Sequence, residues 1–175
     1  AIPPGMTGTD VVGIAQTGTG KTGAFMIPAL ERLRAGAGLQ VLVLCPTREL
    51  AQQVADDTVL LATGTNIRTA AIFGGVGYGP QIKALESGFE VIVATPGRFI
   101  DHAQSKRVDL SNVNYLVLDE ADRMLDMGFR PQIEEVLRGM PKKRQTMLFS
   151  ATMPNGVHDL ALRITREAIW VEATP

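Results

Sequence analysis

Short apolar runs recur along the chain, each followed by polar or glycine-rich residues. The runs are rich in Val, Ile and Leu and are mostly apolar throughout, a pattern typical of strands buried on both faces of a sheet. The predicted strands are Val11–Ile14, Gln40–Cys45, Arg68–Phe73, Val91–Ala94, Tyr115–Leu118 and Thr146–Phe149, with a further β-like run at Ile169–Glu172.

Segments of helical character separate these strands. The predicted helices are Thr22–Arg34, Arg48–Ala62, Gly79–Glu86, Gly97–Gln104, Arg130–Arg138 and Asn155–Thr165. Alternation of strands and helices predicts an α/β fold with a mostly parallel central sheet and helices on both faces. With 175 residues and no repeat or linker, the chain is expected to form one domain over residues 1–175.

A glycine-containing turn lies between the first predicted strand and the first predicted helix. Its sequence is Ala15-Gln16-Thr17-Gly18-Thr19-Gly20-Lys21-Thr22. The general phosphate-binding pattern is G-x-x-x-x-G-K-[ST], so Ala15 stands where that pattern has its first glycine. Glycines let backbone N–H groups approach a phosphate chain, Lys21 supplies positive charge, and the Thr22 hydroxyl can hold Mg²⁺. The alternative is a turn that merely contains Gly and Lys, but the flanking strand and helix favour a nucleoside triphosphate site.

The polar and glycine-rich groups follow the carboxyl ends of the predicted strands. They are Ala15–Thr22, Pro46–Ala51, Gly74-Gly75, Thr95–Arg98, Asp119–Asp122 and Ser150–Thr152. Ligands of open parallel sheets bind at this edge. We therefore expect these scattered groups to lie on one rim of the molecule.

An acidic pair follows the predicted strand Tyr115–Leu118. A carboxylate at this point, downstream of a phosphate loop, suits an Mg²⁺ site, so Asp119 is expected to hold the metal directly or through water. Glu120 is then placed to orient and deprotonate an attacking water. The alternative is a solvated acidic helix start, where Asp and Glu favour the helix dipole.

Composition limits the class of protein only loosely. The chain is 45% hydrophobic and 20% charged, as in globular domains, and no apolar run approaches the ~20 residues of a membrane span. The single cysteine, Cys45, excludes a disulfide framework, and with no visible signal peptide we expect a cytoplasmic, reducing location. A net charge of −1 neither indicates nor excludes nucleic-acid binding, because a local groove can be basic.

Taken together, the six groups resemble the ordered motifs of the DEAD-box RNA helicases over essentially the whole chain. The resemblance accounts for Ala15, since the loop of that family reads A-x-T-G-x-G-K-T. It implies a RecA-like P-loop NTPase fold, ATP and Mg²⁺ as ligands, RNA-dependent ATP hydrolysis and local unwinding of short RNA duplexes.

The resemblance also implies roles for individual residues. Ala15 to Thr22 would bind nucleotide, with Lys21 also catalytic; Thr22 and Asp119 would hold Mg²⁺, with Asp119 and Glu120 as catalytic acidic residues. Asp122, Ser150 and Thr152 would couple hydrolysis to strand separation. The implied RNA-backbone contacts are Pro46, Thr47, Arg48, Gly75, Thr95, Gly97 and Arg98.

Helix-capping patterns and charge support the RNA contacts without reference to the family. Thr95 looks like an N-cap with Pro96 at the first helical position, and Thr47 can start the preceding helix. Helix-start amides together with Arg48 and Arg98 suit phosphates, which predicts little sequence preference. The alternative for both arginines is a surface charge or an intramolecular salt bridge.

The resemblance implies further parts that this chain does not contain. The adenine-reading Gln motif of the family would precede Ala1, and the second RecA-like domain, which brings arginine fingers, would follow the last strand. We therefore expect the chain to be one domain of a larger helicase, with little or no ATPase activity alone.

Two other functions stay open on the sequence. One is a nucleotide- or RNA-binding module without turnover, and the other is the core of a DNA helicase. Asp119 and Glu120 favour an enzyme, since a pure binder needs no group to activate water. A further expectation concerns packing: Met124, Leu125, Met127 and Phe129 are predicted to fill the core rather than form a partner groove.

Overall fold

The computed structural model describes residues 2–15 and 21–172. Its strands are β1 (Val11–Ile14), β2 (Val41–Leu44), β3 (Thr69–Ile72), β4 (Val91–Ala94), β5 (Tyr115–Leu118), β6 (Gln145–Ser150) and β7 (Ile169–Glu172). Its helices are α1 (Ile2–Met6), α2 (Lys21–Leu30), α3 (Arg48–Leu61), α4 (Tyr78–Ser87), α5 (Pro96–Gln104), α6 (Ala121–Asp126), α7 (Arg130–Arg138) and α8 (Asn155–Ile164).

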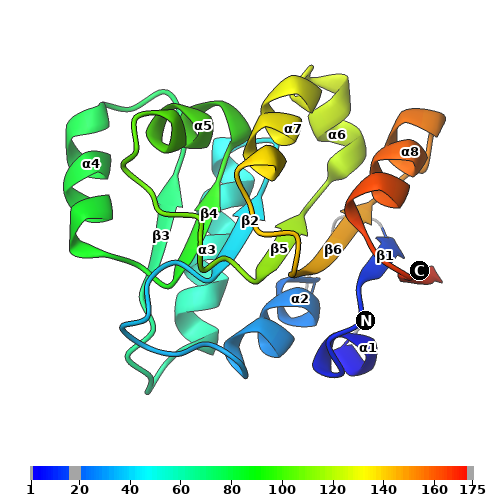
Figure 1. The fold of residues 1–175 in the computed structure, drawn as a ribbon, viewed down its shortest axis with the longest axis horizontal. Helices are drawn as coiled ribbons and strands as arrows, with labels where there is room; N and C mark the ends of the chain where they lie inside the picture. The colour runs from blue at the N-terminus through cyan, green and yellow to red at the C-terminus, as the bar shows by residue number, and fades with distance from the viewer. Residues whose placement is uncertain (1, 16–20, 173–175) are drawn as a thin grey trace.

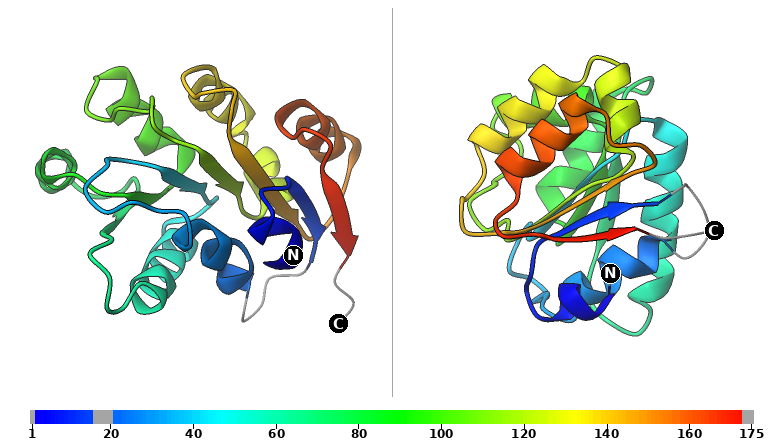
Figure 2. Two further views of the ribbon diagram at one scale, coloured as in Figure 1. Left: turned by 60° about the horizontal axis from the view of Figure 1, so that its bottom comes forward. Right: turned by 90° about the vertical axis from the view of Figure 1, so that its right-hand side faces the viewer.

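The strands form one parallel sheet in the order β3-β4-β2-β5-β6-β1-β7 (Figure 1). Helices cover both faces of the sheet, as the two layers in Figure 2 show. The α/β class and the parallel sheet predicted from the sequence are thus confirmed. All strands point the same way, so the loops that follow them emerge at one edge of the sheet.

Each central strand sends alternate side chains to two separate cores. Val41 and Val43 of β2 face a core that contains residues of α2 and α3, while Leu42 and Leu44 face the larger core under α5 to α8. Burial on both faces explains why these strands are apolar without alternation. It also fixes the register, because a slip by one residue would exchange the two faces.

The predicted strands agree with the observed ones to within one residue at each end. The helix predicted over Thr22–Arg34 was too long: α2 ends at Leu30, where the Arg32 amide bonds to Ala29 O at 3.1 Å in a tighter turn. Helices α1 and α6 were not predicted, because each is too short to show a helical period.

The cluster after the acidic pair packs largely as expected. Met124 is buried, and Leu125 and Phe129 pack against the larger core. The expectation was wrong for Met127, whose side chain is 49% exposed where α6 ends. Gly128, with φ 81°, then turns the chain toward α7.

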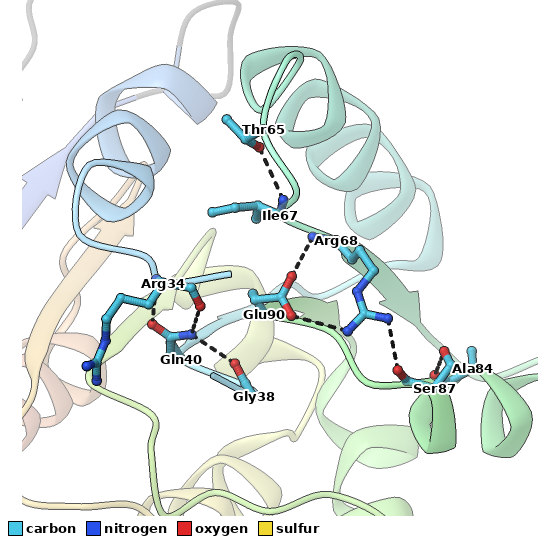
Figure 3. A network of polar contacts seen from close by, with 9 residues as sticks. All are labelled: Arg34, Gly38, Gln40, Thr65, Ile67, Arg68, Ala84, Ser87 and Glu90. Atoms are coloured by element: carbon cyan, nitrogen blue, oxygen red, sulfur yellow. Dashed lines mark hydrogen bonds and ion pairs between the residues drawn. The ribbon is translucent and has the colours of Figure 1, made fainter. Parts of the chain in front are cut away.

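The amino ends of β2, β3 and β4 are held by polar contacts (Figure 3). Buried Glu90 accepts a hydrogen bond from the Arg68 amide at 2.8 Å and pairs with its guanidinium at 3.4 Å. The Gln40 amide donates to Arg34 O at 2.8 Å and to Gly38 O at 3.0 Å. These groups satisfy loop carbonyls and amides at the edge away from the predicted site, so they serve the fold.

None of the helices in the part of the chain that the structure describes is both long and apolar enough to cross a membrane.

Candidate functional site

The centre of the predicted site is an ion pair between residues that are far apart in sequence. Lys21 Nζ lies 2.7 Å from Asp119 Oδ1, and their side chains are only 12% and 4% exposed. Lys21 begins α2 after β1, and Asp119 follows β5, with β6 between the two strands. The sheet thus brings the predicted phosphate-binding lysine and the predicted metal-binding carboxylate together.

An aromatic ring on the intervening strand supports Lys21. The Lys21 ammonium lies 5.8 Å from the centre of the Phe149 ring on β6, within the range of a cation–π contact. The ring lies against Gly13 of β1, which pairs with Phe149 in the sheet. A Cβ at Gly13 would come within 2.6 Å of the ring. A side chain at this position would therefore force either the Phe149 ring, which supports Lys21, or β1 to shift.

Thr22, the other predicted ligand from the phosphate loop, faces a third element. Its hydroxyl donates to Asp57 Oδ2 of α3 at 3.2 Å. The structure therefore places Thr22 next to Lys21 on α2 but directs its hydroxyl to α3. Of the remaining loop residues, Ala15 donates its amide to Ser150 O at 3.0 Å. Gln16, Thr17, Gly18, Thr19 and Gly20 lie outside the described residues.

The backbone at the acidic pair is unusual. Glu120 adopts a left-handed conformation, φ 53° and ψ 52°, which is uncommon for a residue other than glycine. Its side chain is largely buried and lies 3.6 Å from the Arg123 guanidinium one turn along α6. Backbone strain of this kind, about 1–3 kcal/mol, clusters at functional sites, and here it re-aims the Glu120 side chain as β5 passes into α6.

The acidic pair also offers an atom for a metal ion. Asp119 Oδ1 is buried, and no described group donates it a well-aligned hydrogen bond, although Lys21 lies beside it. A buried carboxylate oxygen in this condition fits a hard cation, and carboxylate and hydroxyl oxygens are the ligands Mg²⁺ prefers. Among the described residues no three His, Cys, Asp or Glu side chains gather as a metal cage. The donor set therefore fits an ion held by few protein groups, with water and phosphate completing its shell.

The predicted coupling residues form one hydrogen-bonded unit. Asp122 Oδ2 accepts from the Thr152 hydroxyl at 2.8 Å and from the Thr152 amide at 3.1 Å, while the Ser150 hydroxyl accepts from the Asp122 amide at 3.1 Å. Burial acts to raise the pKa of the Asp122 carboxyl, but the bonds from Thr152, Ser150 and the Arg123 amide outweigh it and lower the pKa. The unit ties α6 to the end of β6.

A second group of predicted residues surrounds the ends of β2 and β3. Thr47 caps α3, and its hydroxyl accepts from the Leu50 amide at 3.2 Å. Arg48 is exposed, stacks 5.1 Å from the Phe73 ring centre, and reaches within 3.7 Å of the point where a Cβ on Gly75 would sit. Gly75 has φ 81°, which favours glycine. Pro46, by contrast, is buried.

The remaining predicted residues lie at the start of α5. Thr95 occupies the N-cap position and Pro96 the first turn, as expected, but the Thr95 hydroxyl makes no capping bond. Gly97 is partly exposed. Arg98 donates from Nη1 to Gln81 Oε1 at 3.1 Å and stacks 3.8 Å from the Tyr78 ring centre. Neither Arg48 nor Arg98 forms an ion pair with a described carboxylate, so the salt-bridge alternative is not supported there.

Four residues that contact the predicted site were not identified from the sequence. Phe149 and Asp57 contact the two ligands on α2, and Gln81 and Tyr78 of α4 contact Arg98. Nothing in the sequence marks these four residues, because their roles depend on contacts that only the fold creates.

Comparison with known proteins agrees with this geometry. The family described as DEAD/DEAH box helicase matches residues 1–160, so the chain belongs to that family. The acidic motif of this chain reads Asp119-Glu120-Ala121-Asp122, and several of the relatives that it matches carry DEAD-box names. A putative DEAD-box RNA helicase, HEL64, of Trypanosoma brucei brucei is 46% identical over 95% of this chain and 30% of that protein.

Other relatives give the same result. The ATP-dependent RNA helicase DBP2 of Chaetomium thermophilum is 47% identical over 97% of this chain and 32% of its own length. The chain thus spans about a third of the curated relatives it matches. The crystal structure of a DEAD box protein from the hyperthermophile Methanococcus jannaschii superimposes with a TM-score of 0.94 at 41% identity, over 99% of this chain and 48% of that one. The RecA-like fold is thereby shown.

Proposed function

We propose that the chain is the ATP-binding domain of an ATP-dependent RNA helicase, using Mg²⁺·ATP to remodel short RNA duplexes. The observation that carries the proposal is the 2.7 Å approach of Lys21 to Asp119 at the carboxyl edge of the sheet. A phosphate-binding cation and a metal-binding carboxylate from separate strands meet there, as nucleoside triphosphate hydrolysis requires.

Each residue at this edge has a separate role in hydrolysis. Lys21 binds and neutralises the terminal phosphates, and the Phe149 ring limits where its ammonium can lie. Thr22 and Asp119 would hold Mg²⁺, which when bound neutralises charge on the phosphates. Glu120 orients an attacking water and accepts its proton, and the left-handed backbone with Arg123 holds that carboxylate in place.

We propose that RNA binds along the same edge through its backbone. Arg48 and Arg98 supply the charges, and the starts of α3 and α5 supply amides. The Asp122, Ser150 and Thr152 unit would transmit the state of the nucleotide because it joins the acidic motif to the end of β6. Because the relatives are about three times as long as the chain, we also propose that a second RecA-like domain completes both sites.

The test is phosphate release from Mg²⁺·ATP, measured with and without single-stranded RNA and with DNA of the same sequence. It is run on this chain and on the chain joined to a second RecA-like domain. We expect RNA to stimulate release in the joined protein, the Glu120→Gln variant to abolish the stimulation, and DNA to stimulate less. Nucleotide binding without any release in either protein would instead identify a binding module, and equal stimulation by DNA would identify a DNA-directed enzyme.

A further inference from the structure

Helix α4 buries a glutamine where an apolar residue would be expected. Gln81 is only 7% exposed and is the buried residue of this helix, while Ile82 and Leu85 are partly exposed. A buried side-chain amide costs free energy unless its groups are hydrogen-bonded. Its partners therefore indicate what the residue is for.

The hydrogen bonds of Gln81 connect the loop after β3 with helix α5, which follows β4. Its Nε2 donates to Phe73 O, just beyond β3, at 2.8 Å. Its Oε1 receives Arg98 Nη1 at 3.1 Å and His102 Nε2 at 2.8 Å, both from α5 after β4. Phe73 O can only accept, so the amide nitrogen must face it and the oxygen must face α5.

The Arg98 guanidinium is held on a second side by an aromatic ring. Tyr78 stacks against it at 3.8 Å, and the Tyr78 hydroxyl donates to Asp101 Oδ2 at 2.6 Å, which fixes the ring on α5. With one Nη1 bond and one face used, Arg98 keeps further N–H donors for another acceptor. An arginine held in this way loses less rotamer entropy on binding an anion than a free side chain does.

The other partner of Gln81 reaches the loop after β3. Phe73 carries the stacked Arg48 guanidinium on its ring, and Arg48 lies beside Gly75. One buried amide thus fixes Arg98 directly and fixes the backbone that supports Arg48. Exposed Arg48, with Gly75 beside it, and partly exposed Arg98 are thus held by one side chain.

We infer that Gln81 is a positioning residue for RNA: it holds the loop after β3 and helix α5 together so that Arg48 and Arg98 present preorganised donors to the phosphate backbone. The inference rests on the proposed function, since it assumes that these arginines bind RNA. Gln81 itself does not touch the RNA, so its effect must pass through Arg98 and the Phe73 loop.

The experiment measures binding of this chain to a fluorescently labelled oligouridylate of about ten nucleotides at about 50 mM salt, where phosphate contacts are strong. Gln81→Met removes both polar functions at similar volume. Gln104→Met is the matched control, because Gln104 is exposed on neighbouring α5. Arg98→Ala tests the proposed function itself, and the double variant Gln81→Met/Arg98→Ala closes the cycle. Mg²⁺·ATP affinity is measured in every variant.

We expect Gln81→Met to weaken RNA binding by about five- to tenfold. Without Gln81 the Arg98 side chain is less restrained before binding, so its loss of conformational entropy on binding RNA lowers the affinity. Gln104→Met should bind as the unchanged chain does, and Mg²⁺·ATP affinity should stay within about twofold throughout. In the Arg98→Ala background the Gln81 substitution should have a smaller effect than in the unchanged chain, because only the route through Phe73 and Arg48 remains.

The inference is overturned if Gln81→Met binds RNA as tightly as Gln104→Met, or if its effect multiplies fully with that of Arg98→Ala. It is also overturned if RNA and nucleotide affinities fall together, since that identifies a purely structural role. If Arg98→Ala binds RNA as tightly as the unchanged chain, the proposed RNA site is contradicted, and the inference falls with it.

Discussion

Lys21 Nζ and Asp119 Oδ1 lie 2.7 Å apart in a nearly buried ion pair. The pair joins the first residue of α2 to the residue that directly follows β5. Each charge is the main compensation for the other, because both side chains are withdrawn from water. The pair is also the point at which the proposed phosphate and metal sites meet. Its stability and its role in binding can therefore be separated by substitution.

Removing one member of the pair leaves an uncompensated charge. We expect Lys21→Met to lower the free energy of unfolding by about 3 kcal/mol. The double variant Lys21→Met/Asp119→Asn, which has no charge at either position, should recover most of this loss. Both should lose Mg²⁺·ATP binding. Urea unfolding with nucleotide titration measures both quantities, and equal stability of the single and double variants would contradict the pairing.

Gly13 does not touch Lys21, but we expect its substitution to weaken nucleotide binding, because it disturbs the Phe149 ring that supports the Lys21 ammonium. In Gly13→Ala the new methyl group would meet the Phe149 ring at 2.6 Å, so the ring or β1 must shift. Overpacking of this kind costs about 2 kcal/mol, and nucleotide affinity should fall because Phe149 supports the ammonium.

Gly79 of α4 provides the matched control for that substitution. A Cβ at Gly79 would contact nothing within 4 Å, so Gly79→Ala should leave stability unchanged or raise it by about 0.5 kcal/mol. Thermal unfolding compares the two. If Gly13→Ala is as well tolerated as Gly79→Ala, the close packing of Phe149 on β1 is wrong.

The Asp122 carboxyl reports the state of the coupling unit. Burial acts to raise its pKa, but the hydrogen bonds from Thr152, the Arg123 amide and Ser150 together outweigh it and lower the pKa from 3.8. Thr152→Val removes the hydroxyl, so we expect the pKa of Asp122 to rise. Carboxyl-carbon NMR through an acid titration measures it. Asp109 is the control: hydrogen bonds from Ser111 lower its pKa, so its titration should not change in Thr152→Val. If the pKa of Asp122 is also unchanged in Thr152→Val, the hydrogen bond from the Thr152 hydroxyl does not stabilise the Asp122 carboxylate.

His102 should make the folded chain sensitive to mild acid. Burial lowers its pKa from 6.5, with Arg107 and Arg98 adding to the effect. The unfolded chain therefore binds more protons between the lowered pKa and 6.5, and stability falls as the pH drops below about 6.5. Protonation would place a second N–H at Nδ1, which lies 3.4 Å from Arg107 Nη1.

The His102 contribution can be isolated with a neutral substitute. Urea unfolding at pH 5.5 and pH 7.5, values on either side of the ordinary His pKa of about 6.5, should show a larger loss of stability on acidification in the unchanged chain than in His102→Gln. The imidazole nitrogens should report the Nε2–H tautomer at the higher pH, as the contact with Gln81 requires. An equal pH dependence in both proteins would contradict the buried neutral imidazole.

Much of the fold was predictable because it depends on local patterns. Val41–Leu44 and Tyr115–Leu118 are apolar throughout, as is typical of parallel strands covered on both faces, and both are buried in the structure. Thr47 caps α3 as its position suggested, and the rim of polar groups followed from strand direction alone.

What could not be predicted depends on contacts between distant residues. The left-handed Glu120 and the short helix α6 follow β5, and no hydrophobic period in the sequence indicates either of them. Gln81 is ordinary in the sequence and becomes notable only when α4 buries it against Phe73 O and Arg98. Asp57 and Phe149 likewise acquire their places beside Thr22 and Lys21 only through packing.

The most direct test of the account is to locate the metal–nucleotide complex on the chain. Mn²⁺, which replaces Mg²⁺ and broadens nearby NMR resonances, is added with a non-hydrolysable ATP analogue. We expect broadening at Lys21, Thr22, Asp119 and Glu120, none at Asp10 on the opposite edge of the sheet, and its loss in Lys21→Met. Broadening at Asp10 instead, or the same pattern in Lys21→Met, would contradict a nucleotide site at the carboxyl edge.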